Sequence, residues 1–327
     1  MKAVIRTIEY YLPEGILANE ELAALYPEWT AARIEEKLGV RQRHIAAADE
    51  CASDLAVQAA ERLFNKAGIE KTSIDYILFC TQSPDYYLPT TACIIQKRLG
   101  LSCALGAIDF NLGCSGYVYG LGLAKGLIES GQAANVLLLT ADTYSKYIDP
   151  QDKSTRTLFG DGATATLISG VESEADLIGP FVYGTDGEGA ENLMVKAGGA
   201  RQGCSLNKPE AGDQVPCLYM NGQEIFTFTL SAVPQAINSL LEKSGLSADQ
   251  IDYYVFHQAN VFMLEGLRRA LKIPKEKFVI SMRDTGNTVS STIPIALKNT
   301  GFASGSTLML VGFGVGYSWG ATLIKWP

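Results

Sequence analysis

An internal repeat constrains the fold of this chain more than any other feature of its sequence. Residues 68–80 (GIEKTSIDYILFC) align without gaps with residues 245–257 (GLSADQIDYYVFH). The two segments share the leading glycine, an Ile-Asp-Tyr triplet and a phenylalanine, and each follows an amphipathic helical pattern. A chance match of the triplet is the alternative, but the matched helices that precede it favour duplication. We therefore predict two related halves, residues 1–170 and residues 171–327.

Helical and strand-like patterns alternate through both halves. In residues 50–68 the apolar residues recur at the spacing of one helix face, and Gly68 stands where a helix C-terminus prefers glycine. The same criteria predict helices over 90–99, 114–130 and 223–244, and strands over 75–80, 104–110, 135–141 and 163–168. This alternation predicts a layered α/β fold. Residues 185–220 lack periodicity, and we expect them to form a long connection between the halves.

The composition excludes several classes of protein. With 47% hydrophobic and 19% charged residues, the chain is typical of a globular protein and not of a disordered one. A formal net charge of −8 argues against a nucleic-acid binder. Seven cysteines are an odd number and too sparse for a disulfide scaffold. There is no signal-peptide pattern at the N-terminus and no apolar run of the roughly 18 residues that a membrane span needs. We expect a cytoplasmic protein with reduced thiols and no membrane partner.

The repeat brings three unusual residues to related points in the two halves. His257 ends a predicted strand at the position that Cys80 occupies in the first half. Cys114 and Asn287 each lie at a turn that leads into a predicted helix, at equivalent places in the two halves. If the halves pack about a pseudo-twofold axis, Cys114, His257 and Asn287 meet at their junction. We predict that these three residues are catalytic.

Each of these residues also has an ordinary structural interpretation. A free cysteine is commonly a small buried hydrophobe, which is our interpretation of the other six. Cys114, however, stands between glycines at a helix N-terminus, where the dipole favours the nucleophilic thiolate, so we expect a lowered pKa. His257 is either a satisfied core residue or a base or hydrogen-bond donor beside the nucleophile. Asn287 is either a helix cap or an amide that orients a substrate carbonyl. We expect His44 to be a surface or hydrogen-bonding residue.

Familiar nucleotide, metal and hydrolase motifs are not matched. The glycine-rich segment 312–320 fails as a dinucleotide fingerprint because Tyr317 replaces its last glycine and no helix follows. Its bare backbone is suited instead to giving an N–H group to an oxyanion. The chain has two histidines and no Cys-x-x-Cys pair, so we expect no zinc site. Tyr117 likewise breaks the Gly-x-Ser-x-Gly pattern around Ser115.

Over nearly its whole length the sequence resembles the thiolase-fold condensing enzymes, and most closely the β-ketoacyl-[acyl carrier protein] synthase III family. The motifs that carry the resemblance are Gly-Cys-Ser-Gly around Cys114, Phe159-Gly-Asp-Gly-Ala163, His257-Gln-Ala-Asn260, Gly286-Asn-Thr288 and the Gly-x-Gly-x-Ser-Trp-Gly that ends at Gly320. The resemblance implies a thiolase-like fold, with two duplicated α/β halves in a layered αβαβα arrangement. It also implies a homodimer that needs no metal or redox cofactor.

The resemblance further implies an acyltransferase that carries out a decarboxylative Claisen condensation in fatty-acid initiation. Cys114 would take an acyl group from an acyl-CoA as a thioester. A malonyl thioester on acyl carrier protein would then lose CO₂, and its carbanion would attack the acyl-enzyme to give a 3-oxoacyl product. His257 and Asn287 would hydrogen-bond the malonyl thioester oxygen. The backbone N–H groups of Cys114 and of the turn near Val315 would form the oxyanion hole.

Residues around this chemistry are also implied by the resemblance. Phe159 and Phe313 would line the acyl pocket, and Leu88 would reach it across a dimer interface. Many relatives have phenylalanine at the Leu88 position, so a longer or branched acyl group could enter here. The residues implied in coenzyme A or carrier binding are Arg33, Lys37, Lys153, Asn260 and Arg269, the last in a basic segment, 267–277, whose ordinary interpretation is a solvated helix face. Phe262 and Thr227 stand where the family often has basic residues.

Several other functions share part of this pattern. 3-Hydroxy-3-methylglutaryl-CoA synthases use a glutamate near the nucleophile, but here Gln82 stands in that segment and cannot take a proton. A specialised condensing enzyme of a secondary-metabolite or glycolipid pathway would share the same three residues. An inactive partner subunit would have lost one of them. A Cys-His hydrolase should lack the duplicated halves.

Overall fold

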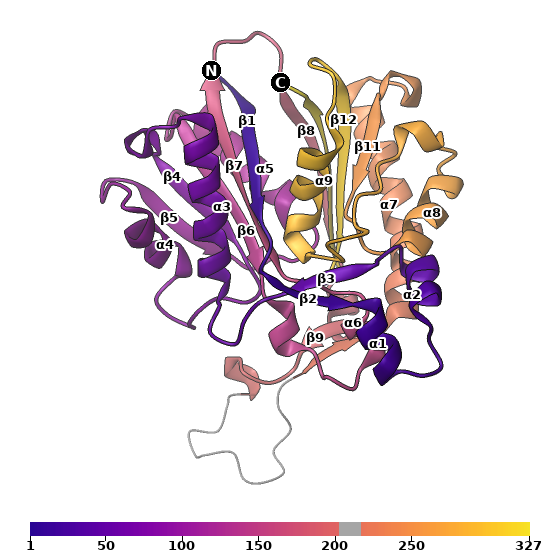
Figure 1. Cartoon of the computed structure of the whole chain (residues 1–327). Helices are drawn as coiled ribbons and strands as arrows, with labels where there is room; N and C mark the ends of the chain where they lie inside the picture. Colours follow the sequence, from indigo (N-terminus) through magenta and orange to yellow (C-terminus); the bar gives the residue numbers. More distant parts are fainter. Residues whose placement is uncertain (203–216) are drawn as a thin grey trace.

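Two mixed β-sheets lie face to face in this protein, with helices between them and outside them (Figure 1). The computed structural model describes residues 1–202 and 217–327. The first sheet has the order β1-β7-β6-β4-β5, formed by Lys2–Tyr11, Gly162–Val171, Asn135–Asp142, Tyr76–Cys80 and Gly106–Phe110. The second has the order β8-β13-β12-β11, formed by Ile178–Thr185, Ser318–Lys325, Thr307–Gly314 and Tyr253–Phe256.

The two sheets repeat one topology. β4 runs parallel to β6, and β11 runs parallel to β12. In both sheets the next two pairings are antiparallel, β6 with β7 and then β1 in the first, and β12 with β13 and then β8 in the second. Beyond β4 the first sheet continues with the parallel strand β5. At the equivalent place beyond β11, the described part of the second sheet has a single parallel bridge, from Tyr254 to Phe278. The predicted duplication is therefore confirmed, while a boundary at residues 170/171 stays a prediction.

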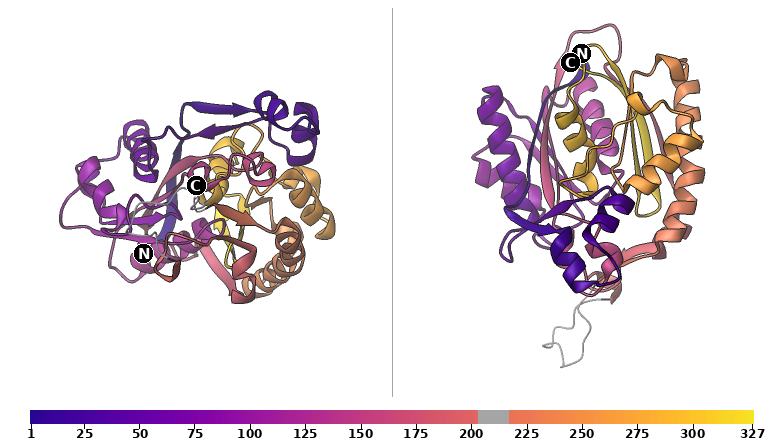
Figure 2. Two further views of the ribbon diagram at one scale, coloured as in Figure 1. Left: turned by 90° about the horizontal axis from the view of Figure 1, so that it is seen from below. Right: turned by 45° about the vertical axis from the view of Figure 1, so that its right-hand side comes forward.

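The helices form three layers around these sheets (Figures 1 and 2). The central layer is α5 (Gly116–Glu129) with α9 (Thr292–Thr300). On the outer face of the first sheet lie α3 (Ala52–Ala67) and α4 (Thr91–Leu99), and on that of the second lie α7 (Gly222–Ser244) and α8 (Val261–Ala270). Successive strand residues face opposite layers: Leu138 packs into the central core and Leu139 into the core under α3. This arrangement confirms the layered αβαβα fold.

Small residues let the central helix lie close to both sheets. A Cβ at Gly120 would stand 2.6 Å from the Leu138 side chain of the first sheet. A Cβ at Gly122 would stand 1.9 Å from the Tyr183 hydroxyl of the second sheet. A larger residue at either position would have to displace the side chain that it meets, since packed interiors leave little room for added methyl groups.

The predicted connection over residues 185–220 is not wholly irregular, which corrects our expectation. Leu193–Val195 (β9) and Leu218–Met220 (β10) pair as a small antiparallel sheet, and Leu193 and Leu218 are buried. Strands of three residues are too short to show an alternating pattern, so periodicity could not find them. Cys204 and the rest of 203–216 lie outside the described residues.

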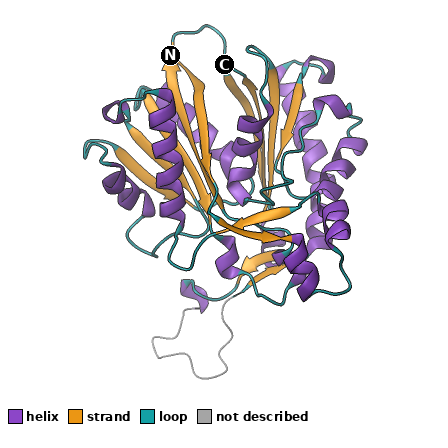
Figure 3. Cartoon of the chain, in the orientation of Figure 1, coloured by secondary structure: helices purple, strands orange, loops and turns teal. Residues whose placement is uncertain are grey.

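A cap of N-terminal elements covers one end of the two sheets (Figures 1 and 3). It consists of β2 (Gly15–Ala18), α1 (Asn19–Leu25), α2 (Ala31–Leu38) and β3 (Gln42–Ile45), with α6 (Lys153–Arg156) beside them. The fully buried Arg43 holds the cap in place: its guanidinium donates to Asn19 Oδ1 at 2.7 Å and to the Thr157 carbonyl at 2.5 Å. Over the described ranges, no helix is both long and apolar enough to cross a membrane.

Truncation of Leu121 in α5 should test the central layer. Leu121 is fully buried, whereas Leu123 on the same helix is 45% exposed. We expect Leu121→Ala to lower the free energy of unfolding by about 2–5 kcal/mol, because it opens a cavity between the sheets. The matched Leu123→Ala should change it by less than about 0.5 kcal/mol. Urea unfolding of both variants measures this, and equal losses would contradict a central layer packed on both sides.

Candidate active site

Cys114 lies where the two halves touch. It follows β5 and precedes α5, and it is 6% exposed. The turn between β12 and β13 of the other half comes up against it: a Cβ at Gly314 would stand 3.2 Å from Cys114 Sγ. Val315 follows Gly314, so the two backbone segments expected to form the oxyanion hole are neighbours.

His257 directly follows β11 and is 2% exposed. Its backbone N–H donates to the Val311 carbonyl at 2.8 Å, and its ring meets Phe313 edge-on with centroids 5.5 Å apart. Nδ1 lies 2.7 Å from Thr292 Oγ1, which in turn lies 3.1 Å from the Val289 carbonyl oxygen. Burial lowers the pKa of His257 to about 3, so the ring is neutral at neutral pH.

Asn287 is held by an unusual backbone conformation. Its backbone N–H donates to the Leu158 carbonyl at 3.0 Å, and its Oδ1 accepts from the Val289 backbone N–H at 2.9 Å. That second bond turns the amide so that Nδ2 lies 3.5 Å from His257 Nε2. Val289 has a φ of 55°, a conformation that β-branched residues rarely adopt. The chain thus orients the Asn287 amide by a strained turn.

The three predicted catalytic residues line one small cavity of about 80 Å³. Phe159 and Phe313 line the same cavity, as does Asn260, whose side chain also caps α8 by accepting from the Met263 backbone N–H at 2.8 Å. The structure therefore brings together residues from both halves around the Cys114 thiol. Leu88 is not among them: it is 82% exposed in the loop between β4 and α4, away from this cavity.

The expected lowering of the Cys114 pKa is wrong. Burial raises the pKa of the thiol, and the carboxylate of Asp142 raises it further. Removing a thiolate from water costs more than a helix N-terminus returns, because the dipole acts only through the first turn. The resting group is therefore a thiol, and a thiolate must form during the reaction.

The residues expected to bind coenzyme A gather around Glu28 and Trp29. Lys153 forms an ion pair with Glu28 at 2.6 Å, and the Arg33 guanidinium donates to the Glu28 carbonyl at 3.2 Å. Lys37 Nζ lies 5.5 Å from the centroid of the Trp29 ring. The sequence pattern did not single out Trp29, although a half-exposed tryptophan among cations offers a flat face for a ligand ring.

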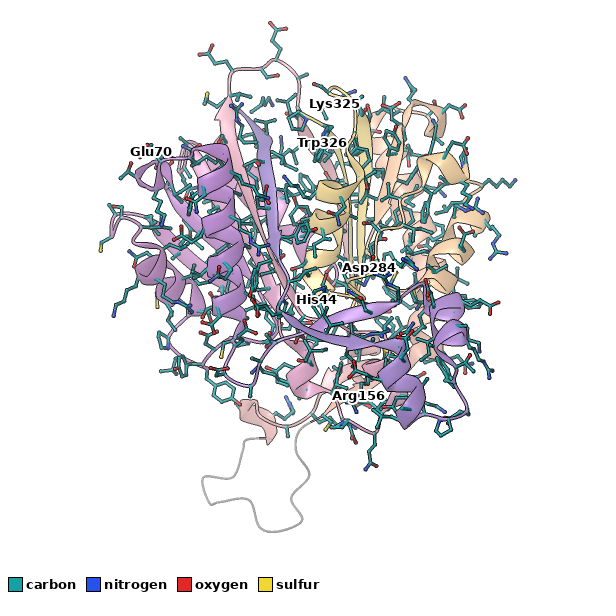
Figure 4. The ribbon with its side chains drawn as sticks, in the orientation of Figure 1. His44, Glu70, Arg156, Asp284, Lys325 and Trp326 are labelled. Atoms are coloured by element: carbon teal, nitrogen blue, oxygen red, sulfur yellow. The ribbon has the colours of Figure 1, made fainter. Side chains whose placement is uncertain are left out.

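Arg269 and His44 lie away from this cluster. Arg269 is exposed in the last turn of α8, where its Nε donates to the Glu265 carbonyl at 3.1 Å. His44, labelled on β3 in Figure 4, has Nδ1 2.5 Å from the Pro13 carbonyl oxygen, in line with a hydrogen-bonding residue. Asp284, labelled nearby, pairs with Arg41 at 2.8 Å.

A buried carboxyl group ties the two halves together beside the cavity. Asp142 ends β6, and its Oδ1 accepts from the Gln82 backbone N–H at 2.8 Å. Its Oδ2 accepts from the Ser290 hydroxyl at 2.7 Å, in the turn that carries Asn287. Burial raises the pKa of Asp142 to about 7. In the sequence, the only sign of this buried carboxyl group is that an acidic residue ends an apolar strand.

Known proteins match this chain over its whole length. Residues 108–187 match the sequence profile of 3-oxoacyl-[acyl-carrier-protein (ACP)] synthase III, and residues 241–326 match that of its C-terminal part. The β-ketoacyl-[acyl-carrier-protein] synthase III of Caldanaerobacter subterraneus subsp. tengcongensis is 37% identical over 289 residues, covering 88% of this chain and 85% of that protein. A solved 3-oxoacyl-(acyl-carrier-protein) synthase III is 52% identical, with a TM-score of 0.95 and 100% of both chains covered. The solved 3-oxoacyl-(acyl-carrier protein) synthase of Burkholderia xenovorans LB400 is 36% identical with a TM-score of 0.90, covering 100% of this chain and 94% of that one.

The duplicated fold, with the three predicted catalytic residues at the junction of the halves, defines a thiolase-fold condensing enzyme. Sequence identity to β-ketoacyl-[acyl-carrier-protein] synthase III extends over 88% of this chain and 85% of that relative, and this places the chain within one family of these enzymes. The chain belongs to the 3-oxoacyl-[acyl-carrier-protein] synthase III family. It is an acyltransferase, as its motifs predicted.

Asp142→Asn should change how stability depends on pH. The folded protein keeps on Asp142 a proton that the unfolded chain, with a pKa of 3.8, has lost, so this residue lowers the free energy of unfolding as pH rises from about 4 to about 7. Asparagine carries no such proton. Relative to wild type, the variant should therefore gain about 1–3 kcal/mol between pH 5 and pH 7.5, at about 1.4 kcal/mol per pKa unit.

Urea unfolding at the two pH values measures this gain. Any constant cost of altered hydrogen bonds cancels in the difference, as do the contributions of His257 and Asp161, which both proteins retain. Parallel pH profiles for variant and wild type would contradict a raised pKa at Asp142.

Proposed function

We propose that this protein condenses an acyl-CoA with malonyl-acyl carrier protein, with loss of CO₂, to give the first 3-oxoacyl product of fatty-acid synthesis. The observation that carries the proposal is the convergence of a thiol, a neutral imidazole and a carboxamide on one cavity. A decarboxylating thioester develops negative charge on oxygen, and neutral donors stabilise that charge without forming an ion pair beforehand.

The first step is acyl transfer to Cys114. The sulfur attacks the acyl-CoA carbonyl, the bond to the coenzyme A sulfur breaks, and the thiol proton leaves with coenzyme A. The backbone N–H groups of Cys114 and Val315 stabilise the tetrahedral oxyanion. The thioester is already an activated acyl group, so the proposed reaction calls on no metal or redox cofactor.

The second step is condensation. Malonyl thioester loses CO₂, and the electron pair moves onto the thioester oxygen, which accepts hydrogen bonds from His257 Nε2–H and Asn287 Nδ2–H. The enolate carbon then attacks the acyl group and expels the Cys114 thiolate, which is reprotonated. Thr292 holds the His257 ring from Nδ1, with its hydroxyl oxygen 2.7 Å away. For the ring proton to stand on Nε2 in this step, the Thr292 hydroxyl turns its one hydrogen from the Val289 carbonyl to Nδ1.

Two surfaces support the substrates of this proposal. Trp29, with Lys37, Arg33 and Lys153 around it, offers stacking and positive charge for the nucleotide of coenzyme A. Arg269 and its basic neighbours at the end of α8 offer a docking site for an acidic carrier protein.

We also propose a homodimer, working in the cytoplasm. β5 ends its sheet and, in the described part of the chain, pairs on one side only. Such an edge is a template for a second copy. Tyr86, Tyr87 and Leu88, exposed by 63%, 79% and 82%, lie in the neighbouring loop and would be covered by it. Leu88 of a second copy would then close the acyl pocket.

Removal of the Cys114 thiol should abolish acylation. Intact-protein mass spectrometry after incubation with acetyl-CoA should find one acetyl group on the wild type and none on Cys114→Ala. Cys93→Ala, at an exposed cysteine, serves as the matched control and should be acetylated as wild type.

The same experiment separates the two steps. Asn287→Ala should still be acetylated, yet condense about 10²–10³-fold more slowly, because one donor to the enolate oxygen is lost. Acetylation of Cys114→Ala, or normal condensation by Asn287→Ala, would contradict the proposed roles.

Reversal of charge at Arg269 should weaken carrier docking. We expect Arg269→Glu to raise KM for malonyl-acyl carrier protein at low salt by about 5–10-fold, with the KM for acetyl-CoA unchanged. Lys97→Glu is the matched control, since Lys97 is exposed in the last turn of α4, the counterpart of α8 in the other half. An equal rise in both variants, or none, would remove Arg269 from the docking site.

A further inference from the structure

Two cavities lie on either side of one tyrosine. The smaller, of about 80 Å³, holds Cys114, His257 and Asn287. The larger, of about 820 Å³, is mostly apolar and includes Tyr144, Tyr147 and Val315 in its lining. Leu193 lines both cavities. The two spaces are therefore adjacent, and what lies between them determines how far an acyl chain on Cys114 can extend.

The wall between the cavities is built from Tyr144 and its neighbours. Tyr144 lies in η2 (Tyr144–Tyr147) and is 4% exposed. Its ring centroid is 5.2 Å from that of Phe159, which lines the smaller cavity, while Tyr144 itself lines the larger one. Phe159 and Tyr144 thus stand back to back across the partition.

A hydrogen bond fixes this wall. The Tyr144 hydroxyl donates to Gln82 Oε1. Gln82 is anchored in turn, since its backbone N–H donates to Asp142 Oδ1 at 2.8 Å and its Nε2 donates to Asn111 Oδ1 at 3.0 Å. A Cβ at Gly113 would stand 2.5 Å from Gln82 Oε1, so the amide lies directly against the backbone that precedes Cys114.

We propose that the Tyr144–Gln82 pair is the specificity determinant that restricts this enzyme to short acyl groups, against the longer or branched group that Leu88 alone led us to expect. The inference rests on the proposed function and names the substrate class of the same site. The cavity that holds Cys114 has about 80 Å³ against about 820 Å³ for the space behind the wall, and this difference favours an acetyl group over a chain of eight carbons.

Displacement of the Tyr144 ring from this wall would cost free energy. Burial raises the pKa of Tyr144, so the hydroxyl stays protonated and remains a donor. Moving the ring aside would leave that buried hydroxyl without its acceptor and would separate it from Phe159. Behind the wall, the larger cavity has the apolar lining that a long chain needs, and because Tyr86 and Tyr87 also line it, the proposed second copy would form its outer side.

The test compares acyl-CoA substrates across matched variants. For each protein, kcat/KM is measured with acetyl-CoA and octanoyl-CoA, and Cys114 adducts are identified by intact mass. Tyr144→Ala should raise the octanoyl-to-acetyl ratio by about tenfold or more, because it joins the two cavities. Gln82→Ala keeps the ring but removes its acceptor, and should shift the ratio in the same direction by a smaller factor.

Tyr147→Ala is the control variant. Tyr147 lines the larger cavity, as Tyr144 does, but not the smaller one. Its removal enlarges the outer space and takes away one edge contact of the Tyr144 ring, with centroids 6.4 Å apart, but it keeps that ring and its hydrogen bond to Gln82. The ratio should therefore stay within about twofold of wild type.

The outcomes separate this inference from the proposed function. A wild type that accepts octanoyl-CoA as well as acetyl-CoA, or ratios for Tyr144→Ala and Gln82→Ala no larger than that of Tyr147→Ala, would overturn the inference alone. If Tyr144→Ala fails to fold, Gln82→Ala decides the matter. A wild type that forms no adduct on Cys114 with any acyl-CoA would overturn the proposed function itself.

Discussion

The contact of two bare backbone segments at the junction of the halves is the constraint on which the rest of the structure depends. A Cβ at Gly312 would stand 2.7 Å from Ser115 Cα, and one at Gly314 would stand 3.2 Å from the Cys114 sulfur. Because neither position carries a side chain, Cys114 of one half lies against the β12–β13 turn of the other. The same approach brings His257, which follows the neighbouring strand β11, to the same cavity. The two duplicated halves therefore approach closely at these glycines, and residues from both halves line one cavity.

The two halves have kept their topology while their strand ends have diverged in chemistry. β4 ends in Cys80, a buried thiol that donates to the Leu112 carbonyl, whereas the equivalent strand β11 is followed by His257. The sheet edges differ as well. The first sheet continues into β5, but the second is reduced there to a single bridge at Phe278. At this edge the first sheet presents the full strand β5 and the second a single bridge, so the pseudo-twofold of the chain does not extend to its surface.

The alternation of helical and strand-like patterns was enough to predict a layered α/β fold, and the repeat was enough to predict the convergence of Cys114, His257 and Asn287. Properties set by the surroundings of a residue were not predictable in this way. The Cys114 pKa depends on burial and on Asp142, which lies 28 positions along the chain and shows no local pattern. Tyr144 and Trp29 matter through what packs against them, and hydrophobic periodicity does not report such contacts. The short strands β9 and β10 pair only because the chain folds back.

Val289 shows how the backbone holds the Asn287 amide in a fixed orientation. A buried valine with φ of 55° costs of order 1–3 kcal/mol, and the surrounding contacts must hold it there. Its backbone N–H, set by that conformation, fixes the Asn287 amide. The strained backbone of Val289 therefore lowers the stability of the fold at a position two residues from Asn287. A turn without this strain would make the protein more stable but would no longer fix the orientation of the Asn287 amide. Variants with a more stable fold therefore need not be better catalysts.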